Sequence, residues 1–176
     1  VLRLAPLPDD DVRDALAAHG RRLSEEETAA LLLQANGSIG RALALSDLIT
    51  IHQKTGIGRL SAYCGAISAG VGAGAGICYL QGGGYTAVAH TVVNAVAVLS
   101  GTICDGAKPS CAAKIATAVE TGILGYEMYC DGQQFYSGEG LVGKGVERTI
   151  RNIGRLGREG MRATDEEILR IMTQCV

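Results

Sequence analysis

The sequence predicts a mainly α-helical fold of packed helices around a Gly/Ala-rich buried helical hairpin. Capping residues precede apolar runs of helical length, whereas clusters of Val, Ile and Thr are too short and too irregular to form a sheet. Gly supplies 25 of the 176 residues and there is no Trp, so Ala, Val, Leu and Ile must fill the core. The 47% hydrophobic content excludes a disordered chain, and the net charge of −2 excludes a globally basic nucleic-acid binder.

Residues 1–47 are expected to form a short helical leader of different origin from residues 48–176. The leader holds eight acidic residues, five Arg and no Cys, whereas the remainder holds all six Cys and 22 Gly. Caps at Asp9–Asp11 and at the Ser24–Glu27 capping box predict two helices, and Ser38–Leu45 predicts a short third one.

Three motifs in this leader carry a resemblance. Leu-Pro-Leu-Pro-Asp-Asp, Leu-Ser-Glu-Glu-Glu and Ala-Asn-Gly-Ser-Ile-Gly-Arg-Ala-Leu follow one another within residues 1–46. Together they resemble the stretch after the ATPase core of the clamp-loader delta-prime subunit of bacterial DNA polymerase III. The likeness contains no nucleotide-binding motif, so it implies a helical lid without an activity of its own.

The middle of the chain carries no charged residue between Arg59 and Asp105. Ser61–Leu80 and Tyr85–Leu99 are apolar segments joined by a Gly-rich turn, which predicts a helical hairpin. A transmembrane hairpin is the alternative. Five Gly in the first segment, and His90 and Asn94 in the second, favour a buried helix pair and no membrane span.

Two more helices follow. Pro109 at the first helical position predicts a helix over Pro109–Gly122. A capping box at Thr164–Glu167 predicts a last helix that continues through Met172.

Between these helices, Gly138–Gly145 fits the spacing of a phosphate loop. Gly145 stands where the metal-binding Ser or Thr belongs and no buried strand precedes the loop, so we interpret Gly138–Gly145 as a Gly-rich connection.

A stripe of basic residues at helical spacing begins within this Gly-rich segment. We interpret the stripe as a solvated face, or one paired to a missing part of the protein, rather than as a nucleic-acid contact. Its six members are Lys144, Arg148, Arg151, Arg155, Arg158 and Arg162.

The six cysteines are the strongest chemical signal. The sequence shows no signal peptide, so we expect a cytoplasmic protein with free or ligating thiols rather than disulfides. Cys104 is expected in a loop and Cys111 at a helix start, where the helix N-terminus and Lys108 would favour the thiolate. Cys78 is expected in the core, and the absence of C-x-x-C argues against a zinc ribbon. Spacing alone leaves open a thiolate-ligated centre or a set of small buried side chains.

The ligated centre is favoured by four longer motifs: Gly58–Gly70, Ser100–Lys108, Gly125–Gly132 and Arg155–Met161. They resemble the serine dehydratase alpha-chain family, in its L-cysteine desulfidase-like branch, over about residues 48–176. The resemblance implies the C-terminal helical half of such a domain, with a [4Fe-4S] cluster on Cys64, Cys104 and Cys111 and with Cys130 and Cys175 as reserve ligands.

The resemblance also implies an activity. L-cysteine or L-serine would undergo β-elimination to pyruvate and ammonia, with sulfide as a further product from cysteine. His90 is a candidate base, although a lone His on a buried helix is more often structural. Asp105 and Lys108 are candidates for orienting a ligand or binding the carboxylate of the small amino-acid substrate, and equally for stabilising their loop. Family members carry a substantial region upstream that includes substrate-binding loops. We therefore expect a fusion or truncated chain with a cluster pocket but no complete substrate site, which would leave it inactive by itself. Its expected partner is a missing N-terminal catalytic half or, in a homo-oligomer, a second copy of the chain. The alternatives are a non-catalytic helical fragment with buried thiols and a small membrane hairpin protein.

Overall fold

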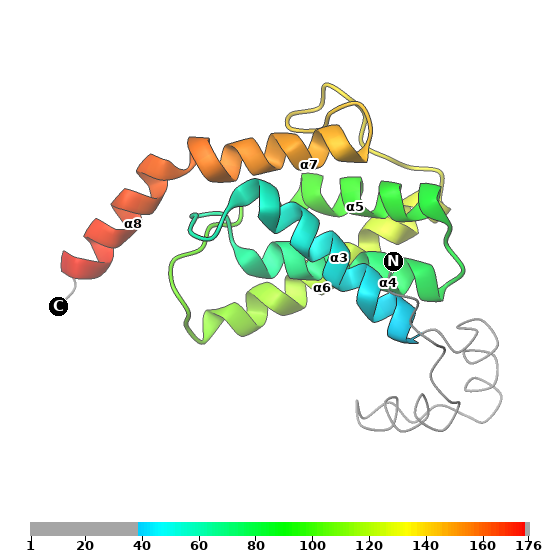
Figure 1. The fold of residues 1–176 in the computed structure, drawn as a ribbon, viewed down its shortest axis with the longest axis horizontal. Coiled ribbons are helices and arrows are strands. Elements are labelled where there is room, and N and C mark those ends of the chain that lie inside the picture. The colour runs from blue at the N-terminus through cyan, green and yellow to red at the C-terminus, as the bar shows by residue number, and fades with distance from the viewer. Residues whose placement is uncertain (1–38, 175–176) are drawn as a thin grey trace.

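The computed structural model describes residues 39–174, and this range folds into a bundle of helices (Figure 1). The mainly α-helical prediction is confirmed, because the only strand-like pairing in this range is a single antiparallel bridge between Tyr63 and Ile103. The helices expected after Asp9–Asp11 and after Ser24 lie outside the described residues. The elements are α3 (Ile39–Ile57), α4 (Gly65–Leu80), α5 (Tyr85–Leu99), α6 (Ser110–Cys130), α7 (Val146–Arg155), the π-helical turn η1 (Leu156–Gly160) and α8 (Arg162–Gln174).

The predicted helical hairpin is present as α4 and α5. Helix α5 has the predicted bounds, but α4 begins at Gly65 rather than at Ser61. The first residues of the predicted segment are extended because they pair with the segment after α5 through the Tyr63–Ile103 bridge. None of the helices within residues 39–174 combines the length and the apolar character that a membrane crossing requires.

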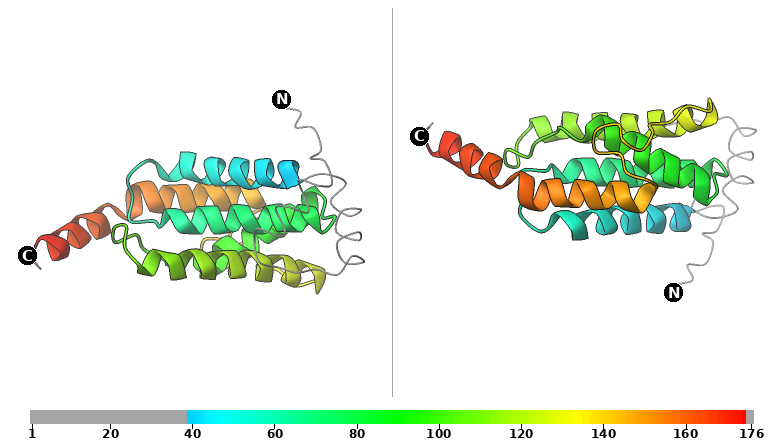
Figure 2. Two further views of the ribbon diagram at one scale, coloured as in Figure 1. Left: turned by 90° about the horizontal axis from the view of Figure 1, so that it is seen from below. Right: turned by 90° about the horizontal axis from the view of Figure 1, so that it is seen from above.

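Helices α4 and α6 touch through their backbones. A Cβ on Gly70 would meet the Ala118 side chain at 2.3 Å, and one on Gly74 would meet the Cα of Gly122 at 2.5 Å. Because both residue numbers increase together along the contact, the two helices run parallel and begin at the same end of the bundle (Figure 2). The high Gly content therefore serves the close approach of these helices.

Helix α6 is longer than the sequence predicts. It runs on to Cys130 rather than ending near Gly122, because Gly122 lies in the α4 contact and Gly125 packs against Ala95 of α5. The helix ends just before Gly132, which adopts a φ of +70°.

Helix α3 packs against the other side of α4. Gly72 faces Ser46 and Gly76 faces Ala42, so α3 and α4 run antiparallel. The prediction of a short helix ending at Leu45 is wrong: no Gly or Pro occurs between Leu45 and Gly56, and the helix continues to Ile57. Helix α3 thus crosses residue 47 without a break, while the different origin of residues 1–47 stays a prediction.

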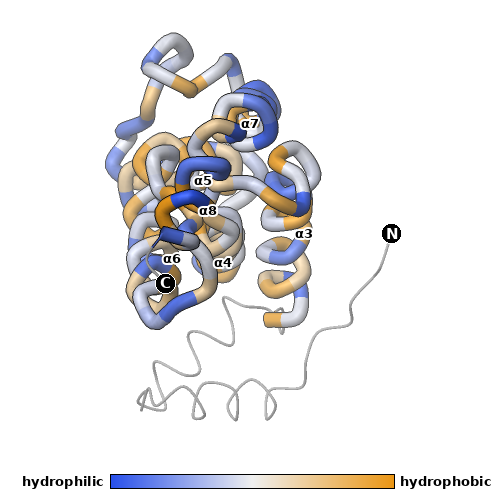
Figure 3. Tube along the Cα trace, turned by 90° about the vertical axis from the view of Figure 1, so that its left-hand side faces the viewer, coloured by the Kyte–Doolittle hydropathy of each residue, from blue (hydrophilic) through white to orange (hydrophobic). Residues whose placement is uncertain are grey.

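The last elements lie along the bundle and then leave it. Helix α7 buries Ile150 and Ile153, and much of the rest of this helix is hydrophilic (blue in Figure 3). The basic stripe is divided by η1, whose Gly157 packs against Ile57. Helix α8 then projects from the bundle (Figure 1) and has no buried residue among those described.

Candidate functional site: the cysteine end of the bundle

The Tyr63–Ile103 bridge aligns two of the cysteines. The Cys64 N–H donates to the Thr102 carbonyl at 3.3 Å, and the Cys104 N–H donates to the Ala62 carbonyl at 2.6 Å. Residues on either side of a bridged residue point to the opposite face of the pairing. Cys64 and Cys104 therefore share one face as diagonal neighbours, while the Tyr63 ring enters the core.

The parallel pairing of α4 and α6 brings the third cysteine to the same end. Cys64 immediately precedes α4, and Cys111 lies in the first turn of α6. The Cys111 Sγ lies 3.6 Å from the Gly106 carbonyl, which it reaches as a weak donor across the loop that begins at Cys104. All three thiols are free, with Cys64 buried and the other two half-buried.

A charged cluster lies beside these thiols. Asp105 accepts a hydrogen bond from Lys108 and another, at 2.7 Å, from the Nζ of Lys114. Those two hydrogen bonds, first from Lys108 and then from Lys114, lower the pKa of Asp105 to about 2. Asp105 is consequently a carboxylate throughout the neutral range.

Lys114 is a member of this site that the sequence analysis missed. Its Nζ also donates to the Ile103 carbonyl at 2.9 Å, so one side chain contacts the bridge and the loop together. The pKa of Lys114 is raised, mainly by its hydrogen bond to Asp105, while partial burial opposes the shift and the charge of the Asp105 carboxylate adds to it. Its position three residues after Cys111 on a helix was the available signal, since that spacing puts both side chains on one face.

The other candidate residues lie elsewhere. His90 stacks on Tyr129 with ring centroids 5.4 Å apart, near the far end of α6. Cys130 ends α6, and the 19 helical steps from Cys111 to Cys130 place the two residues about 28 Å apart. Cys78 is buried near the end of α4, and Cys175 lies outside the described residues. The structure does not bring His90, Cys78 or Cys130 to the other thiols.

The three thiols do not form a site for a single metal ion. Within residues 39–174 there is no group of three or more His, Cys, Asp or Glu close enough to surround one metal ion. Each cysteine of an iron–sulfur cluster binds a different iron, so its thiolates stand farther apart than the ligands of one ion. Three free thiols around one loop are compatible with that wider arrangement.

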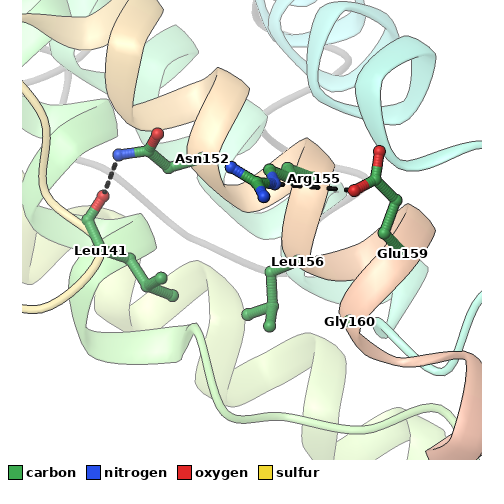
Figure 4. Close-up of a pocket in the computed structure, with 6 residues that line it drawn as sticks. All are labelled: Leu141, Asn152, Arg155, Leu156, Glu159 and Gly160. Atoms are coloured by element: carbon green, nitrogen blue, oxygen red, sulfur yellow. Dashed lines mark hydrogen bonds and ion pairs between the residues drawn. The ribbon is translucent and has the colours of Figure 1, made fainter.

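A surface pocket of about 480 Å³ lies away from the cysteines, on the α7 side (Figure 4). Its polar groups already have partners, because the Asn152 Nδ2 donates to the Leu141 carbonyl at 3.0 Å and Arg155 pairs with Glu159 at 3.5 Å. No cysteine lines this pocket, so we place the candidate site at the cysteine loop instead.

Comparison with known proteins connects this arrangement to a family. The serine dehydratase alpha-chain family matches residues 23–170. UPF0597 proteins from Desulfitobacterium hafniense, Treponema denticola and Fusobacterium nucleatum are 63%, 50% and 45% identical over 85%, 75% and 88% of this chain. The matches cover 35%, 31% and 34% of those relatives, so the chain spans about a third of their length.

Two negative results accompany these matches. No solved structure matches the chain. The comparisons give no support to the expected likeness of residues 1–46 to the clamp-loader subunit, and the family match begins at residue 23, within that leader.

Proposed function

The chain belongs to the serine dehydratase alpha-chain family, and from this membership we propose that it carries the iron–sulfur centre of an enzyme that deaminates L-cysteine or L-serine. The reaction is β-elimination, which releases sulfide or water and leads to pyruvate and ammonia. The observation that carries the proposal is the meeting of Cys64, Cys104 and Cys111 at one end of the bundle, through the Tyr63–Ile103 bridge and the parallel α4–α6 pair.

In this proposal Cys64, Cys104 and Cys111 hold a [4Fe-4S] cluster. Thiolates are the usual ligands of such clusters, and three of them leave one iron without a protein ligand from this set. When bound, the group supplies a Lewis acid that polarises the β-hydroxyl or β-thiol of the substrate.

The charged cluster has a separate task. Lys108 is partly exposed, so its ammonium is available to the carboxylate of an amino acid, and Asp105 orients it by accepting its hydrogen bond. His90 has no part in the proposal because it stacks on Tyr129. The base that removes the α-proton, and the remaining substrate contacts, are assigned to the two thirds of the relatives' length that this chain does not span.

Anaerobic reconstitution with iron and sulfide tests the ligand set. We expect the wild-type chain to bind iron and acid-labile sulfide and to develop iron–sulfur absorbance. Cys104→Ala should lose most of that iron, because a thiolate ligand is removed. Cys78→Ala is the matched control, since Cys78 is buried near the other end of α4 and should leave the iron content unchanged.

The outcomes separate the possibilities. A wild-type chain without iron, or equal iron in the Cys104 and Cys78 variants, contradicts the proposal. Loss of iron in Cys130→Ala would instead transfer a ligand role to a residue at the far end of α6. Pyruvate formation by the loaded chain from L-cysteine or L-serine tests whether this part turns over alone.

A further inference from the structure

Lys114 links three parts of the cysteine end. Its Nζ reaches from α6 to the Ile103 carbonyl at 2.9 Å and to the Asp105 carboxylate at 2.7 Å. The side chain is 22% exposed, so these contacts form with much of its surface removed from water. Ile103 is the bridged residue beside Cys104, and therefore the ammonium contacts both neighbours of that cysteine, Ile103 through its backbone and Asp105 through its side chain.

Few other contacts hold this segment. Between the end of α5 and the start of α6 the chain has no regular element beyond the one bridge. Gly106 turns the loop with a φ of +90°, and the Lys108 ammonium bonds to Asp105, within the loop itself. Within the described residues, two side chains of α6 hydrogen-bond this loop: Cys111 reaches the Gly106 carbonyl as a weak donor at 3.6 Å, and Lys114 donates to both the Ile103 carbonyl and the Asp105 carboxylate.

The same contact sets the local charge. Asp105 carries one negative charge and faces two ammonium groups, so this trio retains one positive charge next to the thiols. Lys114 follows Cys111 by three residues on α6 and contacts both neighbours of Cys104, so its ammonium lies next to this part of the site. A positive charge next to the cysteines favours the reduced state of a redox centre bound there, because reduction adds a negative charge.

We propose that Lys114 is a positioning residue of the cysteine site, which holds Cys104 and Cys111 in register and raises the reduction potential of the centre bound there. The second part rests on the proposed function. The first part concerns the chain alone and can be judged without iron.

Hydrogen exchange on the iron-free chain tests the register. Lys114→Met keeps a long side chain but removes the ammonium, and we expect amides of residues 102–106 to exchange about tenfold faster or more. Lys114→Arg should restore slow exchange, because it keeps the charge and the donors. Lys144→Met is the matched control, since it removes one charge from an exposed lysine in the loop before α7. Unchanged exchange in Lys114→Met, or an equal rise in Lys144→Met, overturns the proposal.

Redox titration of the reconstituted chain tests the charge. We expect Lys114→Met to shift the midpoint to a more negative potential, with Lys114→Arg and Lys144→Met close to wild type. Faster loop exchange with an unchanged potential would limit Lys114 to a structural tether and overturn its effect on the centre. A wild-type chain that binds no iron contradicts the proposed function. The exchange experiment still tests whether Lys114 holds the Cys104 loop in place against α6.

Discussion

At the scale of single residues, the surroundings divide the cysteines into distinct chemical classes. Cys78 has no exposed surface, and burial is the main cause that raises its pKa. Cys130 is exposed at the end of α6. A raised pKa keeps the Cys78 thiol protonated, so this residue acts as a small apolar side chain in the folded protein.

Thiol alkylation of the iron-free native chain, followed by mass spectrometry, should reflect this division. We expect Cys130 to react first and Cys78 to stay unmodified until the protein unfolds, because the thiolate is the nucleophile and must be accessible. Denatured chain is the control in which both should react at similar rates. Early modification of Cys78 would contradict its burial.

The site was only partly predictable from the sequence, for reasons specific to its residues. The loop position of Cys104 and the helix-start position of Cys111 followed from Gly106 and Pro109, and the structure has them there. The alignment of Cys64 with Cys104 depends on a bridge between segments far apart in sequence, which no local pattern indicates. Lys114 was missed because a lysine on a helix has no motif of its own.

At the scale of elements, the contact between α4 and α6 determines where the cysteines lie. Sequence patterns predicted the bounds of α5 correctly but misplaced the end of α6. Glycine often ends a helix, whereas Gly122 lies within α6 and packs against α4. A single sequence does not distinguish these two uses of glycine. The partner helix does so in the folded protein.

Replacing one packing glycine should therefore be costly. A Cβ at Gly74 would lie 2.5 Å from the Cα of Gly122, so we expect Gly74→Ala to lower the free energy of unfolding by about 1–3 kcal/mol despite the better helix propensity of Ala. Gly65→Ala lies in the same helix with nothing within 4 Å of the added carbon. It should be neutral or stabilising by at most about 1 kcal/mol.

Urea unfolding, followed by circular dichroism, measures both variants. A Gly74→Ala protein as stable as Gly65→Ala would show that the helices separate easily. That result would also weaken the argument that this contact fixes the cysteine end.

At the scale of the whole molecule, the described chain combines a packed bundle with one weakly attached helix. Helix α8 buries no residue fully, although Ile168 packs against the core and Met172 approaches Gly106 of the cysteine loop. Few buried contacts mean a small free energy of local opening. The helix that covers part of the cysteine loop is thus the one most easily displaced.

Hydrogen exchange across the molecule should show this difference in stability. We expect amides of α8 to exchange faster than those of α4 and α5, whose buried residues include Val71, Val92 and Val96. Mass spectrometry of peptic fragments gives both rates in one sample of native chain. Equal protection of α8 and α4 would indicate that α8 has a covering partner in solution.

The single bridge at the cysteine end also bears on the order in which the protein folds. It joins Tyr63 to Ile103, and the nearby Ser61 hydroxyl donates to the carbonyl of Gly157, a residue 96 positions away. Contacts at such separations require closure of long loops, so they form after the local helices. In a chain emerging from the ribosome, the helices would then form before Cys64, Cys104 and Cys111 come together. A cofactor that needs these three cysteines would bind at a late step of maturation.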